Sequence, residues 1–155
     1  MKKILFFFFV NIGLIYAQEN VVNVVYDLTT KDLATFELKI LKSIVSNKAY
    51  YEGKLKELNV AVVIHGGAYK FFVKNPADSE FKEDKELLNS YKDLAKRIKY
   101  MSENYEVEFL MCGVGMQKHA LNKNGIYTFI KVIKNASIGL IDKQDAGYAY
   151  IPVAK

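Results

Sequence analysis

The chain has 155 residues, of which 51% are hydrophobic and 25% charged, as in an ordinary packed globular protein. These proportions exclude a disordered chain, a collagen-like chain and a low-complexity linker, and 2 Pro with 9 Gly exclude a loop-dominated fold. A net charge of +5, without a basic stripe that alternates with aromatic residues, gives no indication of nucleic-acid binding.

The first 17 residues have the pattern of a secretory signal peptide. Lys2 and Lys3 precede an apolar run that ends at the small residue Ala17, and a polar segment follows. The run is shorter than the about 20 residues that a membrane helix needs. We therefore predict an exported protein, periplasmic or secreted, with a signal peptide at 1–17, one domain at 18–155 and no membrane contact after cleavage. An uncleaved anchor and a buried N-terminal element are the alternatives.

Strand and helix patterns alternate along the rest of the chain. Strands are predicted where apolar, β-branched runs occur, at residues 20–28, 58–64, 106–111, 130–134 and 148–153. Helices are predicted at residues 33–50, 68–74, 87–101, 116–122 and 137–146. Thr29 or Thr30 is expected to cap the first helix, while Gly53 and Gly147 end the first and last helices. The alternation predicts an α/β domain with a parallel sheet, helices on both faces, and Pro152 on an edge strand.

Side chains that can carry chemistry follow the strand ends. Asp27, His65, Cys112 and Asn135 stand at the ends of the first four predicted strands. Ligands of open α/β sheets bind beyond the carboxyl ends of the strands. If the second and third strands are neighbours, His65 and Cys112 lie in one crevice.

Cys112 is the single cysteine of the chain, which excludes an internal disulfide and dithiol exchange. It precedes Gly113 and Gly115, and a glycine turn followed by a helix N-terminus favours an anion and lowers the pKa of a thiol. Two interpretations stay open. Cys112 is either a reactive thiol or a small buried apolar side chain.

His65 is followed by Gly66 and Gly67, which indicate the close approach of a ligand or partner. It is either a base or proton donor for Cys112 or a turn histidine bonded to backbone. Asp27 either orients His65 or caps a helix.

Tyr69 is expected to line the same crevice as His65 and Cys112. Lys70 is expected to lie on a solvated helix face. The histidine and cysteine spacings lack the pairs of a zinc site. The segment from Gly113 to Gly115 lacks the third glycine of a dinucleotide fingerprint, and no phosphate-binding loop is present. We therefore expect neither a metal nor a cofactor.

Three segments together resemble the DsrE/DsrF-like family, including its YchN-type group. They are Ile64–Ala68 (IHGGA), Phe109–Gly113 (FLMCG) and Ala146–Ile151 (AGYAYI), within a resemblance that covers roughly Val21 to Pro152. The resemblance implies a three-layer α/β/α sandwich with a parallel five-stranded sheet. It also implies homo- or hetero-oligomers, often trimers or hexamers.

In the sulfur-relay members of this family, the cysteine that matches Cys112 carries sulfane sulfur as a persulfide. The resemblance thus implies a sulfur carrier or transferase in which Cys112 accepts sulfur and His65 assists proton movement. The glycine turns at 66–67 and 113–115 would admit the donor. The donor or acceptor is a protein or a small sulfane-sulfur compound.

Two other functions stay open. In an oligomeric binding or assembly module, Cys112 is packed and silent, and an apolar surface that includes Phe71 and Phe72 makes the oligomer contacts. In a cysteine-dependent hydrolase, the turn after Cys112 supplies the oxyanion hole. Thiol titration tests the first alternative and burst kinetics with an activated ester test the second.

Overall fold

The computed structural model describes residues 20–154, and the predicted signal peptide lies outside this range. Its centre is a five-stranded, all-parallel sheet with the strand order β4-β3-β2-β1-β5. The strands are β1 (Val21–Leu28), β2 (Glu57–Ile64), β3 (Glu108–Cys112), β4 (Lys131–Ile133) and β5 (Ala149–Val153). The predicted parallel five-stranded sheet is confirmed, and Pro152 lies on the edge strand β5.

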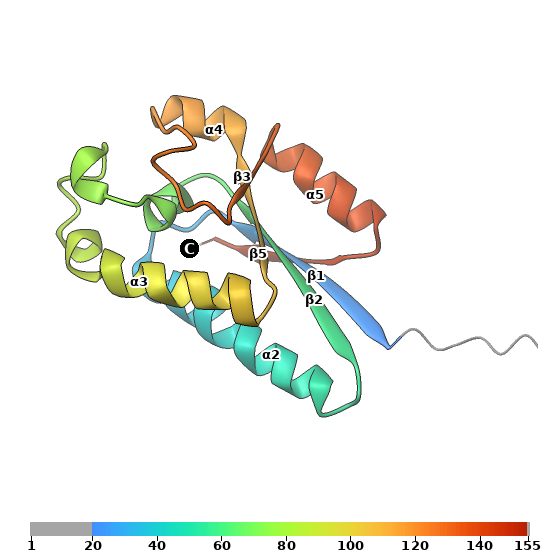
Figure 1. Cartoon of the computed structure of the whole chain (residues 1–155). Helices are drawn as coiled ribbons and strands as arrows, with labels where there is room; N and C mark the ends of the chain where they lie inside the picture. The colour runs from blue at the N-terminus through green and yellow to red at the C-terminus, as the bar shows by residue number, and fades with distance from the viewer. Residues whose placement is uncertain (1–19, 155) are drawn as a thin grey trace, which may run out of the picture.

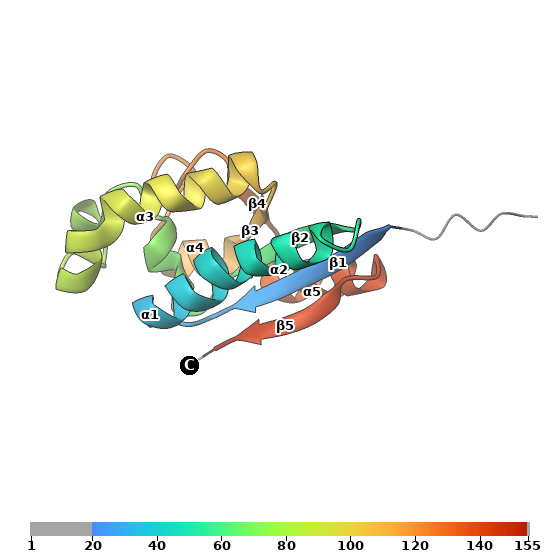
Figure 2. The same cartoon turned by 90° about the horizontal axis from the view of Figure 1, so that it is seen from below.

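Helices cover both faces of the sheet (Figures 1 and 2). One face carries α1 (Leu33–Phe36), the π-helical η1 (Glu37–Lys42), α2 (Ser43–Glu52) and α3 (Lys85–Asn104), and the other carries α5 (Ala136–Asp145). The short elements η2 (Ala68–Phe72), η3 (Pro76–Asp78) and α4 (Gly113–Lys118) lie beyond the carboxyl ends of the strands. Within residues 20–154, no helix combines the length and the apolar character that crossing a bilayer requires.

The first predicted helix is present, but its start differs from the expectation. Asp32, not Thr29 or Thr30, is the N-cap, and its Oδ2 accepts from the Thr35 backbone N–H at 2.8 Å. The hydroxyl of Thr30 accepts instead from the Asp32 N–H at 3.1 Å. The turn before the helix therefore occupies Thr30, and the capping position shifts to the next acidic side chain. Gly53 ends α2 as predicted.

The glycines after β3 do not form the predicted turn. The helix α4 begins directly at Gly113 and ends at Lys118, so Cys112 is its N-cap residue. Glycine has a low intrinsic helix propensity, which is why the sequence pattern placed the helix start three residues later.

An aromatic cluster joins η2 to the first helix. Phe36 stacks on Phe71 with ring centroids 4.4 Å apart and meets the edge of Phe72 at 5.7 Å. Both Phe71 and Phe72 are buried. The expectation that they form an exposed oligomer surface is therefore wrong, because η2 packs them against α1.

Lys70 is buried as well, contrary to the predicted solvated face. Its Nζ lies 2.7 Å from Oδ2 of Asp84, the N-cap residue of α3. A buried ammonium group needs such a partner, because leaving it unpaired costs several kcal/mol. The bond connects η2 to the start of α3, whose predicted apolar face packs on the core.

We expect Phe36→Ala to lower the free energy of unfolding by about 3–5 kcal/mol, because it leaves a cavity between two rings. Chemical denaturation measures the change. Leu38→Ala is the matched control, since Leu38 is 53% exposed on the neighbouring turn. It should cost no more than about 0.5 kcal/mol. Equal losses in the two variants would contradict the assignment of the aromatic cluster to the core.

Candidate functional site

The strand order brings the predicted site residues to one edge of the sheet. Ile64 pairs with Met111, so His65 and Cys112 stand level at the ends of the neighbouring strands β2 and β3. Asp27 lies in β1, on the other side of β2. The second and third strands are thus neighbours, which is the condition under which His65 and Cys112 were expected to share one edge.

The thiol of Cys112 is surrounded by hydrogen-bond donors. Burial raises its pKa, but the neighbouring Gly115 N–H, the Tyr69 hydroxyl and the N–H groups of Ala136 and Val114 lower it. The net effect places the pKa of this thiol below its ordinary value. Only 7% of Cys112 is exposed, so protein groups rather than bulk water surround the thiol.

These donors come from the beginnings of two helices. Val114 and Gly115 belong to the first turn of α4, and Ala136 is the first residue of α5. Unpaired N–H groups at a helix start favour a negative charge. Asn135, the fourth predicted strand-end residue, acts as the N-cap of α5, and its Oδ1 accepts from Ile138 N–H at 2.8 Å. Asn135 therefore caps α5, and the Ala136 N–H at the start of α5 helps to lower the pKa of the thiol.

Tyr69 is buried against α4 and does not line an open crevice, contrary to the prediction. Its hydroxyl donates to the carbonyl oxygen of Cys112 at 2.8 Å, and only 1% of the residue is exposed. Burial raises the pKa of Tyr69, and its interactions with Cys112 raise it further. The phenol therefore stays protonated and acts as a donor at neutral pH.

The contact with Tyr69 explains the glycine at position 115. A Cβ atom at Gly115 would lie 1.8 Å from the Tyr69 hydroxyl oxygen, so no other residue fits without moving the ring. At Gly113, a Cβ atom would approach the carbonyl oxygen of Ile133 to 3.0 Å. The two glycines thus permit close packing around the end of β3, a different role from the predicted turn that admits a donor.

His65 makes its side-chain contact with Asp27. Its Nε2 lies 2.5 Å from Asp27 Oδ1, and the Tyr150 hydroxyl donates to Asp27 Oδ2 at 2.6 Å. Asp27 lies inside β1, which supports the orienting role over the capping role. The side chain of His65 is 30% exposed and that of Asp27 16%. The groups acting on the thiol are Tyr69 and backbone N–H groups, so the structure does not support direct deprotonation of Cys112 by His65.

Sequence reasoning missed Tyr150. It lies on β5, which pairs with β1, and its hydroxyl reaches Asp27 across 123 positions in sequence. Hydrogen bonding to the carboxylate raises the pKa of this tyrosine. Alternation along β5 puts Tyr150 and Pro152 on one face, but the pattern does not reveal which strand is the neighbour.

Gly66 and Gly67 approach another part of the chain. Gly66 has a φ of +60°, and Gly67 N–H donates to the Thr29 carbonyl at 2.9 Å. A Cβ atom at Gly67 would lie 2.7 Å from Cβ of Lys31. The close contact predicted for these glycines is therefore with the loop between β1 and α1.

The second histidine lies on the far side of Tyr69. The ring of His119 is 4.8 Å from that of Tyr69, and its Nδ1 bonds to Glu80. From residue 20 to residue 154, no three His, Cys, Asp or Glu side chains are grouped so as to hold a metal ion.

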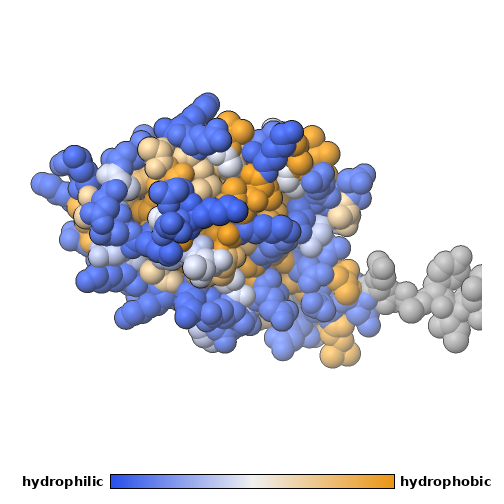
Figure 3. Space-filling view, turned by 45° about the horizontal axis from the view of Figure 1, so that its top comes forward, coloured by the Kyte–Doolittle hydropathy of each residue, from blue (hydrophilic) through white to orange (hydrophobic). Residues whose placement is uncertain are grey.

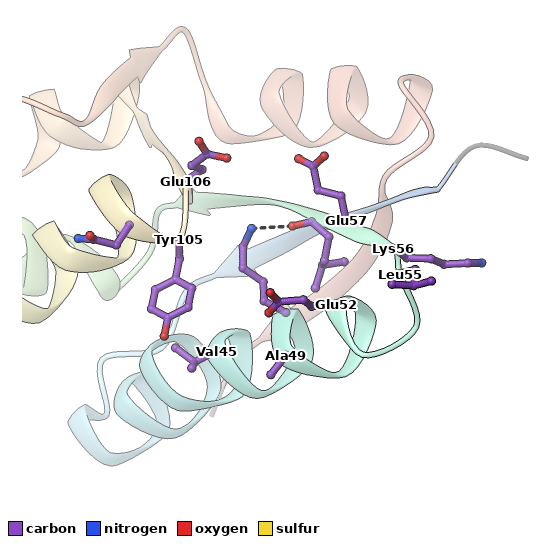
Figure 4. A pocket seen from close by; sticks show the side chains of 11 residues that line it. Val45, Ala49, Glu52, Leu55, Lys56, Glu57, Tyr105 and Glu106 are labelled. Carbon is purple, nitrogen blue, oxygen red and sulfur yellow. Dashed lines mark hydrogen bonds between the residues drawn. The ribbon is translucent and has the colours of Figure 1, made fainter. Parts of the chain in front are cut away.

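A cavity of about 570 Å³ lies at the opposite, amino end of the strands (Figure 4). Val45, Ala49 and Glu52 of α2 line one side, and Tyr105 and Glu106 before β3 line the other. Ligands of parallel α/β sheets bind at the carboxyl ends, so we assign the candidate site to the edge that carries Cys112.

The chain matches the model of the DsrE/DsrF-like family over residues 23–153. It belongs to this family. The resemblance carried by the three sequence segments is thereby confirmed for nearly the whole of the described chain.

A solved structure of a protein of unknown function from Methanobacterium thermoautotrophicum is similar to this DsrE/DsrF-like chain, with a TM-score of 0.61 and 16% identity. The similarity covers 84% of this chain and 98% of that chain, and it shows the shared α/β fold. A comparison with curated protein sequences gave no match.

We expect Tyr69→Phe to raise the pKa of the Cys112 thiol, because it removes one donor while retaining the ring. The pH dependence of the thiolate ultraviolet absorbance measures the change. Tyr127→Phe is the matched control, because the Tyr127 hydroxyl is buried without a partner among residues 20–154. It should leave the thiol pKa unchanged. A thiol pKa that is equal in wild type and Tyr69→Phe would refute the stabilising role of Tyr69.

Proposed function

We propose that this DsrE/DsrF-like protein carries sulfane sulfur on Cys112. The observation that carries the proposal is the thiol with a lowered pKa between the starts of α4 and α5. The thiolate attacks the outer sulfur of a donor, a new S–S bond forms, and the S–S bond of the donor breaks. The electron pair of the broken bond leaves with the remainder of the donor. The cysteine then holds the transferred sulfur as a persulfide.

The N–H and hydroxyl groups around Cys112 also suit the state in which this cysteine carries sulfur. A persulfide is an anion at neutral pH, and the N–H groups of Val114, Gly115 and Ala136 together with the Tyr69 hydroxyl favour negative charge. The chain has one cysteine, so a loaded Cys112 has no internal thiol with which to form a disulfide. The transferred sulfur must therefore pass to another molecule.

His65 is assigned a proton-transfer role during release of the sulfur. It is half-buried and oriented by Asp27, which also accepts from Tyr150. The backbone N–H groups that a hydrolase would need for its oxyanion hole are the same groups that lower the pKa of the thiol, which favours sulfur carriage over ester hydrolysis.

We expect the folded protein to gain one or more sulfur atoms after exposure to polysulfide, and a reductant should reverse the gain. Intact-mass spectrometry measures it. Cys112→Ser should show no gain, and the fold of this variant is checked by circular dichroism. Sulfur that loads on Cys112→Ser, or loads on wild type only after unfolding, would refute the carrier function.

A second function, assembly into homo-oligomers, is favoured by exposed apolar side chains. Ile138 and Ile141 lie on α5, and Tyr150 and Ile151 lie on the edge strand β5. The family resemblance implies trimers or hexamers. This surface takes the place of the one that Phe71 and Phe72 were expected to form.

We expect light scattering to give a mass above that of a monomer, and Ile141→Lys to lower it. Ile141 is 62% exposed, so the substitution removes an apolar contact without affecting the core. Leu55→Lys is the control, since Leu55 is 87% exposed at the other end of the sheet. A monomeric wild type would contradict the assembly function and leave sulfur carriage unaffected.

Finally, we propose export to the periplasm or the cell exterior. The support is the basic start at Lys2 and Lys3, the apolar run and the small residue Ala17.

A further inference from the structure

The part of the chain that forms the thiol site contains no acidic residue. From Phe109 to Ile141 the sequence has neither Asp nor Glu, while it contains Lys118, Lys123, Lys131 and Lys134. The whole chain has 17 acidic residues, and of these four lysines only Lys131 pairs with a carboxylate of the described residues, that of Glu108 at 3.7 Å. Uncompensated positive charge attracts anions and raises their local concentration.

A groove of about 540 Å³ lies between α4 and the edge strand β4. Its lining includes the apolar side chains of Val114, Leu121 and Ile133 and the basic residues Lys123 and Lys134. Hydrophobic patches lie among hydrophilic side chains on the upper face of the molecule, which Figure 3 turns toward the viewer. The groove therefore offers an apolar floor and two ammonium groups.

The groove borders the backbone that follows Cys112, because Gly113 and Val114 are among its lining residues. Val114 lines the groove, and its backbone N–H lies among the donors that lower the pKa of Cys112. Lys134 lines it as well and stands two residues before Ala136, another of these donors. A molecule in the groove thus lies next to the backbone that holds the thiolate.

The two lysines of the groove differ from the lysines that the fold pairs with carboxylates. Lys70 and Lys143 are paired with Asp84 and Glu108. Lys123 and Lys134 are exposed, and neither takes part in an ion pair with a carboxylate of residues 20–154. Their charges are therefore available to a ligand.

We propose that this groove binds the sulfur donor and that the donor is a small organic persulfide bearing a carboxylate. The inference rests on the proposed sulfur carriage. The donor carboxylate pairs with Lys123 and Lys134, and its hydrocarbon part covers the apolar floor. An inorganic ion such as thiosulfate matches the charge of the groove but has no apolar part to bury.

The transfer balances without an added oxidant or reductant. The Cys112 thiolate attacks the outer sulfur of the donor R–S–S–H, and the bond between the two donor sulfurs breaks. The electron pair leaves with R–S⁻, and the hydrogen stays on the transferred sulfur. The immediate product is Cys112–S–S–H, which then loses its proton to water and becomes the persulfide anion. The lysines that bound the donor carboxylate still hold the departing thiolate until it diffuses away.

The test compares persulfides of 3-mercaptopropionate, 2-mercaptoethanol and cysteamine, which carry a negative, a neutral and a positive group. Stopped reactions and intact mass give the rate of Cys112 loading. The carboxylate donor should react about fivefold to tenfold faster than the neutral donor at low ionic strength, and added salt should reduce the difference. The double variant K123Q/K134Q should abolish this preference. The control K39Q/K85Q removes two exposed lysines elsewhere and should retain it.

A second readout does not depend on sulfur transfer. Alkylation by iodoacetate and iodoacetamide probes the same thiol with an anion and a neutral reagent of similar size, and the unfolded chain supplies the intrinsic rate ratio. In the folded protein the ratio should shift toward iodoacetate, and K123Q/K134Q should reverse the shift.

The outcomes separate the groove from the carrier function. An unchanged alkylation ratio, or a preference for the carboxylate donor that K123Q/K134Q retains, overturns the proposal that the groove binds the donor. Thiosulfate that loads Cys112 as fast as the carboxylate donor overturns the organic donor. A shifted alkylation ratio without loading by any donor overturns sulfur carriage and the donor assignment, and it leaves an anion site in the groove.

Discussion

The hydrogen bond from the buried Tyr69 hydroxyl to the end of β3 organises the site. It connects η2 to Cys112, and the phenol stays a donor because burial and the thiol both raise its pKa. The ring occupies the space where any side chain at position 115 would stand, so α4 can begin directly after the thiol only with Gly115. One tyrosine therefore determines the position of the helix start and the direction of the N–H groups that favour the thiolate.

The parallel sheet adds the remaining groups. In such a sheet all strands end at the same edge, so the starts of α4 and α5 meet around the end of β3. The order β3-β2-β1-β5 then lines up the thiol, His65, Asp27 and Tyr150 along that edge. The thiol and His65 have different surroundings, since backbone N–H groups surround the first and a carboxylate contacts the second.

The charged side chains are also distributed unevenly between the core packing and the thiol site. Carboxylates pair with lysines where the fold needs neutral packing, as between Lys70 and Asp84. They are missing from the segment that surrounds Cys112, where Lys123 and Lys134 face a groove. Unpaired exposed lysines contribute little to stability. Their placement in the groove next to Gly113 and Val114 is the feature on which the proposed donor site rests.

Hydrophobic periodicity by itself determined the alternating strands and helices, and the single cysteine determined where chemistry was to be sought, because both signals are local. Only the tertiary structure decided what each side chain contacts. Phe71 and Lys70 looked exposed in a short helix, yet α1 and Asp84 cover them. Gly115 was predicted to form a turn, whereas its lack of a side chain leaves room for the Tyr69 ring. Tyr150 reaches Asp27 only because β5 pairs with β1. A local pattern encodes which face of an element is apolar, whereas the partner of that face depends on contacts between residues far apart in the chain.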